Sequence, residues 1–177
     1  MRIAIDARMY GTRQRGIGRY LMKLIENLEV VDKENQYTVF LRRANFDEYI
    51  PGNGNFKKAL WDIPWYGWRE QIQNAKLKIQ KSDLYHFPHW NISLFFNRPF
   101  IVTIHDLELF SSNRTREATT RSRLTYWFKF QIFKLIFRHA ILASRAIIVP
   151  SNVVREQLLD LYPQARKKVH VIYEAPA

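Results

Sequence analysis

The sequence contains no cysteine, which excludes a disulfide scaffold, a thiolate metal site and a cysteine nucleophile. It also lacks any run of about 20 apolar residues, so we expect no membrane-spanning helix. The N-terminal stretch MRIAIDARMYG does not resemble a signal peptide, because Asp6 and Arg8 interrupt its short apolar run. Hydrophobic residues make up 47% and charged residues 25% of the 177 positions, a balance typical of one globular domain.

Acidic residues are scarce, since 16 Asp and Glu stand against 28 Lys and Arg, giving a formal net charge of +12. Such an excess predicts attraction to an anionic partner, whether nucleic acid, acidic lipid, a phosphorylated substrate or an acidic protein domain. No recognisable DNA- or RNA-binding module is present, so we expect no nucleic-acid partner.

Seven short apolar runs predict β-strands, and several are nearly all apolar, as in the buried strands of a parallel sheet. They are Ile3–Ala7, Tyr37–Leu41, Lys58–Trp61, Leu84–Phe87, Phe100–His105, Ala146–Pro150 and Val169–Tyr173. Helical spacing between them predicts helices at Ile17–Leu28, Trp65–Gln80, Thr119–Ala143 and Asn152–Tyr162, the last with Ser151 as its N-cap. This alternation predicts one α/β domain with a Rossmann-like, doubly wound, mainly parallel sheet and helices on both faces.

The segment from Gly11 to Arg19 is the first candidate site, because it follows the first strand and leads into a helix. Backbone N–H groups at such a place can bind phosphate, and glycines allow close approach. The candidate residues are Arg13, Arg15, Gly16, Ile17, Gly18 and Arg19. The segment matches neither GxGxxG nor a Walker loop, so a flexible loop with solvated arginines is the alternative.

Two histidines three residues apart precede Trp90: His86 lies near the end of the fourth predicted strand and His89 just after it. A third metal ligand at suitable spacing is not visible, so we expect no metal site. These side chains either face a ligand at the sheet edge or pack at the end of the strand. A further strand ends in His105-Asp106, which places an imidazole and a carboxylate where acid/base groups often lie. The alternative is that Asp106 caps a turn and His105 is a hydrogen-bonded structural residue.

The predicted long helix is rich in cations, and eight Lys and Arg lie between Ser111 and Arg145 against one acid, Glu117. Helical spacing places Arg123, Trp127, Lys134 and Arg138 on one face, with Phe130 near that stripe. Another face carries Leu124, Phe128, Ile132, Leu135 and Leu142, and we expect it to pack in the core. Basic charge beside exposed aromatic residues is typical of a helix on anionic lipid, whereas a core helix with outward-reaching cations is the alternative.

In order along the chain, these segments resemble the N-terminal half of a glycosyltransferase with the GT-B fold, of the family 4 type. The resemblance rests on MRIAIDARMYG, GIGRYLMKLIENL, HFPHWNISLFF, IVTIHDLELF, ASRAIIVPSNVVREQLLDLYP and KVHVIYEAP. It implies that residues 1–177 form one acceptor-binding domain and that a C-terminal donor-binding domain is absent from this chain. The complete enzyme would move a hexose from a UDP- or GDP-sugar to a lipid-linked or polysaccharide acceptor, with retention and without a metal.

The resemblance also implies roles for individual residues. Gly16 and Gly18 match the loop that faces the donor phosphates, and His105 matches a histidine near the transferred sugar, with Asp106 orienting its loop. We take His86, His89, Trp90 and Ser151 as candidates on the acceptor side. The chain alone is expected to be inactive and cytoplasmic, peripheral on the inner face of the membrane. The alternative is a stand-alone membrane-surface or partner-binding subunit of a two-chain glycosyltransferase.

Overall fold

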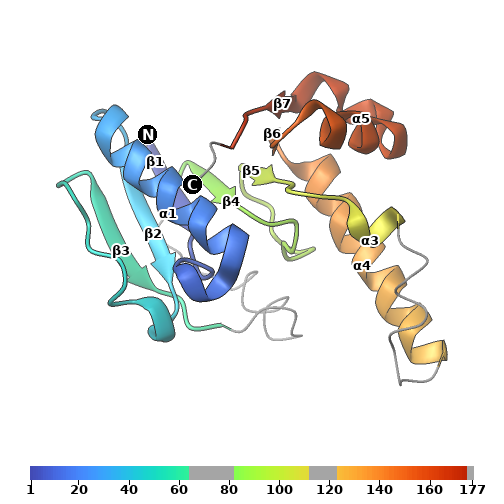
Figure 1. The fold of residues 1–177 in the computed structure, drawn as a ribbon, viewed down its shortest axis with the longest axis horizontal. Coiled ribbons are helices and arrows are strands. Elements are labelled where there is room, and N and C mark those ends of the chain that lie inside the picture. The colour runs from blue at the N-terminus through green and yellow to red at the C-terminus, as the bar shows by residue number, and fades with distance from the viewer. Residues whose placement is uncertain (64–81, 112–122, 175–177) are drawn as a thin grey trace.

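The computed structural model describes residues 1–63, 82–111 and 123–174, which form a seven-stranded, all-parallel sheet with helices on both faces (Figure 1). The strands are β1 (Arg2–Asp6), β2 (Gln36–Leu41), β3 (Phe56–Leu60), β4 (Leu84–Phe87), β5 (Phe100–Thr103), β6 (Ala146–Val149) and β7 (Val169–Val171). All seven predicted strands are confirmed, with ends that differ by up to two residues. The Rossmann-like α/β prediction is therefore confirmed.

The described helices are α1 (Arg15–Val31), α3 (Glu108–Ser111), α4 (Arg123–Ala143) and α5 (Asn152–Leu161), with short 3-10 helices at Thr12–Gln14, Arg43–Asn45 and Pro163–Lys168. The predicted helix Trp65–Gln80 lies outside the described residues. Ser151 caps α5 as predicted, because its hydroxyl accepts a hydrogen bond from the backbone N–H of Val154 at 3.2 Å. At the C-terminal end of α4, the Lys168 ammonium donates to the carbonyls of Leu142 and Ser144, each at 2.8 Å.

The strand order is β3-β2-β1-β4-β5-β6-β7, so the chain first builds the sheet outward from β1 to β3. It then returns to the other side of β1 and builds outward again from β4 to β7. The reversal falls between β1 and β4, which pair in parallel through Ile5 and His86. In open α/β sheets, ligands bind outside the carboxyl ends of the strands at such a switch point.

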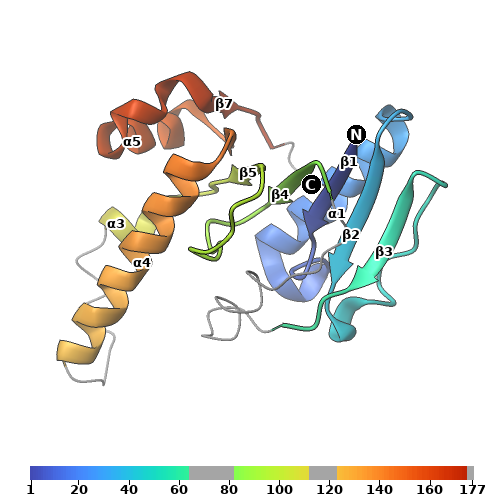
Figure 2. The same cartoon turned by 180° about the vertical axis from the view of Figure 1, so that it is seen from behind.

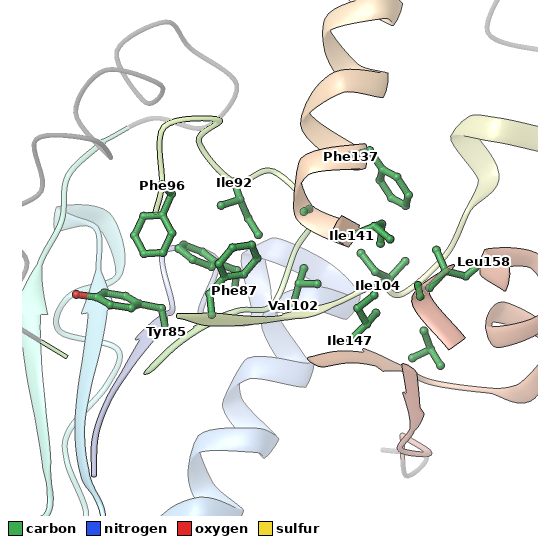
Figure 3. Close-up of a cluster of buried hydrophobic side chains, with 14 of the residues drawn as sticks. Tyr85, Phe87, Ile92, Phe96, Val102, Ile104, Phe137, Ile141, Ile147 and Leu158 are labelled. Carbon is green, nitrogen blue, oxygen red and sulfur yellow. The ribbon is translucent and has the colours of Figure 1, made fainter. Parts of the chain in front are cut away.

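Two apolar clusters cover the two faces of the sheet. On one face, Leu21 and Ile25 of α1 pack on Ile5, Val39 and neighbouring residues of β1 and β2. On the other face, α4 and α5 cover β4, β5 and β6 (Figures 1 and 2). Figure 3 shows Phe137, Ile141 and Leu158 directed toward Val102, Ile104 and Ile147. Neighbouring strand residues thus point to opposite faces, and both faces are buried, as the all-apolar runs predicted.

The predicted orientation of α4 is wrong. The face expected in the core is exposed: Phe128 is 60%, Leu135 53%, Ile132 44% and Leu142 39% accessible. The side chain of Leu124 lies outside the described residues. The core is instead contacted by the opposite face, through the residues Phe133, Ile136, Phe137, Ala140 and Ile141. Apolar residues occur on both sides of this helix, and the aromatic side chains of the second face fill the space above β5 and β6.

Candidate active site at the carboxyl ends of the strands

A small hollow, open to solvent, lies at the switch point between β1 and β4. Its lining comes from the segments that follow these two strands: Asp6, Arg8, Met9, Pro88, His89 and Asn91. The hollow therefore brings together residues at and just after the end of β1 and the segment that follows β4. Of the site residues predicted from the sequence, His89 lines this hollow.

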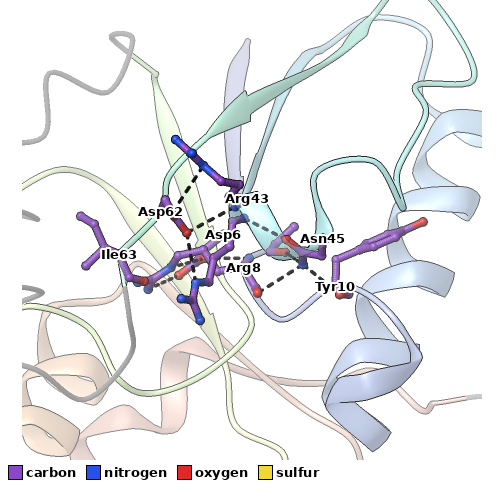
Figure 4. Close-up of polar contacts among 9 residues, drawn as sticks. Asp6, Arg8, Tyr10, Arg43, Asn45, Asp62 and Ile63 are labelled. Atoms are coloured by element: carbon purple, nitrogen blue, oxygen red, sulfur yellow. Dashed lines mark hydrogen bonds and ion pairs between the residues drawn. The ribbon is translucent and has the colours of Figure 1, made fainter.

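Asp6 and Arg8 form a buried ion pair at the edge of this hollow (Figure 4). The guanidinium donates to both carboxylate oxygens, with distances of 2.8 Å from Nε and 2.7 Å from Nη2. A third bond runs from Nη1 to the carbonyl of Ile63 at 3.3 Å, and the guanidinium lies 4.0 Å from the ring centroid of Trp61. Arg8 is only 2% exposed, so this charge is held in place by contacts from both sides and fixes the start of the loop after β1.

Asn45 holds the next part of that loop. Its side-chain amide donates to the carbonyl of Tyr10 at 2.9 Å and, at longer distances, to those of Ala7 and Arg8 (Figure 4). Its side-chain oxygen accepts from the backbone N–H of Arg42 at 2.9 Å. A single buried amide therefore satisfies backbone groups of two loops that meet at the sheet edge.

His86 lies within the central strand β4, is buried, and does not line the hollow. Its Nε2 lies 2.9 Å from the hydroxyl of Thr103 on β5, and the same hydroxyl lies 3.1 Å from that of Tyr20 on α1. Burial, reinforced by the charge of His105, lowers the pKa of His86 to about 4. The neutral ring therefore links β4, β5 and α1, which favours the packing interpretation of this residue.

His105 lies two residues beyond the end of β5, which stops at Thr103 and not at His105 as predicted. Its Nδ1 is 2.9 Å from a carboxylate oxygen of Glu174, and its Nε2 is 3.1 Å from the carbonyl of Pro88. The ring of Tyr20 packs edge-on against it, with centroids 4.8 Å apart. Contacts with Glu174, Pro88 and Tyr20 therefore hold His105 just beyond the carboxyl end of β5. Its side chain is 18% exposed.

His89 and Trp90 follow β4 and point in different directions. The ring of His89 lines the hollow, and its Nδ1 accepts from the backbone N–H of Asn91 at 3.2 Å. Burial lowers the pKa of His89 to about 4, and the charge of His105 acts in the same direction. Trp90 instead packs edge-on against Phe133 of α4, with centroids 4.6 Å apart. The structure thus places His89 at the hollow and Trp90 against α4.

Gly16 and Gly18 lie inside helix α1 and not in a loop before it, because α1 begins at Arg15, two residues earlier than predicted. A Cβ at Gly18 would overlap the carbonyl oxygen of Gly11 and lie 2.9 Å from that of Met9, whereas Gly16 has open space around it. The left-handed conformations in this segment belong to Gly11, with φ +107°, and to Arg15, with φ 52°. Glycine is therefore needed at Gly11 for its conformation and at Gly18 for close packing.

The cations of this segment are available to a ligand. The side chains of Arg13, Arg15 and Arg19 are exposed, and none forms an ion pair with the residues that the structure describes. The N-cap Gln14 makes no side-chain capping bond, and the first turn of α1 holds no acid. The N-terminal end of α1, flanked by three arginines, thus has a positive electrostatic potential. It lies at the carboxyl ends of the strands, as the hollow does.

Asp106 and Ser151 have local partners. The Asp106 carboxylate accepts from the backbone N–H of Glu108 at 3.3 Å, at the start of α3, and the side chain is exposed. This is the turn-capping alternative stated for Asp106. Ser151 follows β6 at the same sheet edge, with its hydroxyl engaged in the α5 cap. Neither side chain is among the hydrogen-bond partners of His105, and neither lines the hollow.

The outward face of α4 combines apolar and basic residues. Trp127 is 54% exposed and packs edge-on against Phe128, and Lys134 and Arg138 are exposed further along the same helix. Phe130 is half-buried, stacks on Phe133 and carries the Lys134 ammonium 4.6 Å from its ring centroid. Arg123 is the first residue of α4, and its side chain lies outside the described residues.

Neither a metal cluster nor a membrane span occurs in the described part of the chain. Across residues 1–63, 82–111 and 123–174, no three His, Asp or Glu side chains are grouped as metal ligands. Among the same residues, no helix has the length and apolar composition to cross a bilayer.

Sequence reasoning missed several residues of this site, among them Arg8, Tyr20, Asn45, Thr103 and Glu174. A signal existed for Arg8, because an Asp-x-Arg pair directly after an apolar strand places two charges at a strand mouth. The others act through contacts between segments separated by 17 to 83 positions. Spacing along the chain does not encode such contacts.

Comparison with known protein families identifies the family of this chain. The chain matches the family model described as Glycosyltransferase Family 4 over residues 15–175, which covers every strand except β1. No curated protein matches the chain. The matched span includes both histidine segments, α4, α5 and the segment that carries Glu174. The chain therefore belongs to glycosyltransferase family 4 and has the Rossmann-like fold of an N-terminal domain of that type.

Proposed function

We propose that this chain is the acceptor-binding half of a retaining glycosyltransferase that moves a hexose from a UDP- or GDP-sugar to a lipid-linked or polysaccharide acceptor. The observation that carries the proposal is the hollow at the β1–β4 switch point, with His105 and the arginine-flanked start of α1 at the same sheet edge. Catalysis of this transfer needs cationic groups and N–H donors for the leaving diphosphate. It also needs the acceptor hydroxyl fixed near the anomeric carbon.

The residues divide between these two tasks. Arg13, Arg15 and Arg19, with the N-terminal end of α1, would bind the donor phosphates across the cleft. The hollow, lined by His89 and Asn91, would hold polar groups of the acceptor. The donor would be bound mainly by a second domain, fused to this one or supplied by another chain, so the domain alone is expected to be inactive. The proposed transfer uses no metal.

The test is sugar transfer by the complete system, with the donor half fused or added as a separate chain. A panel of UDP- and GDP-hexoses and a lipid-linked acceptor would be used as substrates. The H105A variant should transfer at least about tenfold more slowly than the native chain, with an unchanged unfolding midpoint. The matched control is H170A, because His170 is exposed on β7. Native transfer rates in H105A would overturn the role assigned to His105.

A second proposal is that the outward face of α4 contacts an anionic membrane surface. The observation that favours it is the exposed apolar group Trp127, Phe128, Ile132, Leu135 and Leu142, next to Lys134 and Arg138. A helix with this composition can insert its apolar side chains below the headgroups while its cations bind acidic lipid. This would place the domain at the inner face of the membrane, beside a lipid-linked acceptor.

Flotation with vesicles tests this contact. We expect the chain to float with phosphatidylglycerol vesicles at low salt and not with phosphatidylcholine vesicles. The W127A and K134E variants should each lower the bound fraction severalfold. The controls F95A and K57E remove an exposed aromatic and an exposed cation elsewhere on the surface and should bind normally. Absence of flotation by the native chain, or equal loss in the controls, would refute the proposal.

A further inference from the structure

The contact between His105 and Glu174 joins the segment that follows β5 to the segment that follows β7. After Val171, the chain runs from the edge strand back toward β4 and β5 (Figure 2). This brings the Glu174 carboxylate to 2.9 Å from Nδ1 of His105, across 69 positions of sequence. Glu174 is 40% exposed and His105 18% exposed, so the ion pair lies at the border of the site and not on the open surface.

Both partners of the His105 ring are acceptors. The carbonyl of Pro88 accepts at Nε2, and the carboxylate of Glu174 accepts at Nδ1. A neutral imidazole has one N–H donor, so it can form only one of these bonds. The tautomer with its proton on Nδ1 donates to Glu174, and the tautomer with its proton on Nε2 donates to Pro88.

The remaining neighbours fix the ring without supplying a charge of their own. The edge-on ring of Tyr20 limits rotation of the imidazole from the side of α1. The other titratable groups near the ring are His86 and His89, which interact with it electrostatically. Glu174 is thus the acid that contacts the His105 side chain among the described residues.

We propose that Glu174 is a positioning residue, which holds the His105 ring in its site orientation and keeps a proton on Nδ1. The kinetic consequence rests on the proposed function: a ring held in this way would keep one orientation and one tautomer toward the reacting groups during transfer. Glu174 itself touches neither substrate in this scheme. Loss of the carboxylate would leave Nδ1 without its acceptor and the ring free to turn.

Nuclear magnetic resonance of the chain labelled with 15N-histidine tests the positioning directly. The sequence has five histidines, so the His105 signals can be assigned by their loss in H105Q. We expect a slowly exchanging Nδ1 proton on His105, with contacts to the Tyr20 ring, in the native chain at pH 6 and low temperature. The signal should persist in E156Q, an exposed α5 glutamate paired with Arg155, and weaken in E174Q. It should be lost in E174A, and its survival there would overturn the proposal.

Kinetics in the complete transferase form the second measurement. The E174A variant should lower kcat about tenfold and leave the KM for the nucleotide sugar within about twofold, because Glu174 acts on the ring and not on the donor. An unchanged kcat in E174A would overturn the catalytic consequence. If the native system transfers no sugar, the proposed function fails, and the histidine spectra still decide whether Glu174 positions His105.

Discussion

The buried ring of His86 makes the stability of this domain depend on pH. Burial lowers the pKa of His86 from 6.5 to about 4, so the folded state keeps the ring neutral in acid where the unfolded chain takes up a proton. Between pH 6.5 and pH 4 the unfolded state binds more protons, and stability falls as the pH falls. The contribution is fully present above about pH 6.5 and is lost progressively toward pH 4.

The size of the effect follows from the two pKa values. Linkage gives a loss of about 2 kcal/mol at pH 5 and about 3 kcal/mol at pH 4, relative to pH 7, from His86 alone. The H86Q variant has no ring to protonate, so this part of the pH dependence disappears. Its stability at pH 7 should also fall, since the hydrogen bond to Thr103 and the fit of the ring are changed. The informative quantity is therefore the slope against pH.

Urea unfolding followed by tryptophan fluorescence at several pH values between 4.5 and 7.5 measures this slope. His89 has a pKa lowered to about 4 as well, so H86Q should keep a weaker pH dependence and H86Q/H89Q should lose more of it. The H170Q control alters an exposed histidine and should match the native curve. Identical slopes in native and H86Q chains would refute the assignment of the buried neutral ring to His86.

Three further predictions concern packing and helix ends, each measured by urea or thermal unfolding. G18A should cost about 1 to 3 kcal/mol because its methyl group would overlap the Gly11 carbonyl, while G16A should be neutral or stabilise by up to about 1 kcal/mol; equal effects would contradict the close approach at Gly18. F137A should cost about 3 to 5 kcal/mol and F128A less than about 0.5 kcal/mol, and the reverse order would mean that α4 is turned over. K168M removes the donor to two carbonyls at the end of α4 and should cost about 1 to 2 kcal/mol, whereas the exposed K167M should leave the unfolding midpoint unchanged; matching midpoints would rule out the cap.

The strands were predictable because their apolar runs are short, separate and bounded by polar residues. A strand buried on both faces needs no alternation, so Phe100–Thr103 and Ala146–Val149 are identified by composition alone. The order of helices and strands then restricts the topology, since parallel connections are right-handed. The ends are less certain, as the early start of α1 shows, because a glycine can belong to a loop or to the first turn of a helix.

The orientation of α4 was not predictable from spacing, because both faces of the helix are apolar. Phe128, Ile132 and Leu135 form one such row, and Phe133 and Phe137 belong to another. Which row is buried depends on the surface beneath, where Trp90 and Phe110 contact the second row. A helix that is apolar on both sides leaves one apolar face outside the core, and the proposed membrane contact rests on that exposed face.

The three histidines at the strand mouths show how far sequence can assign a site. Parallel pairing predicted that His86, His89 and His105 would lie near one sheet edge, and the structure places them there. Their environments differ in ways that spacing does not encode: His86 is enclosed by β5 and α1, and His89 lines the hollow with a lowered pKa. His105 alone of the three meets two acceptors, one of them the charged carboxylate of Glu174. A proton is therefore disfavoured at His86 and His89, whereas His105 differs from them in the contacts with Glu174 and Pro88 that fix the orientation of its ring.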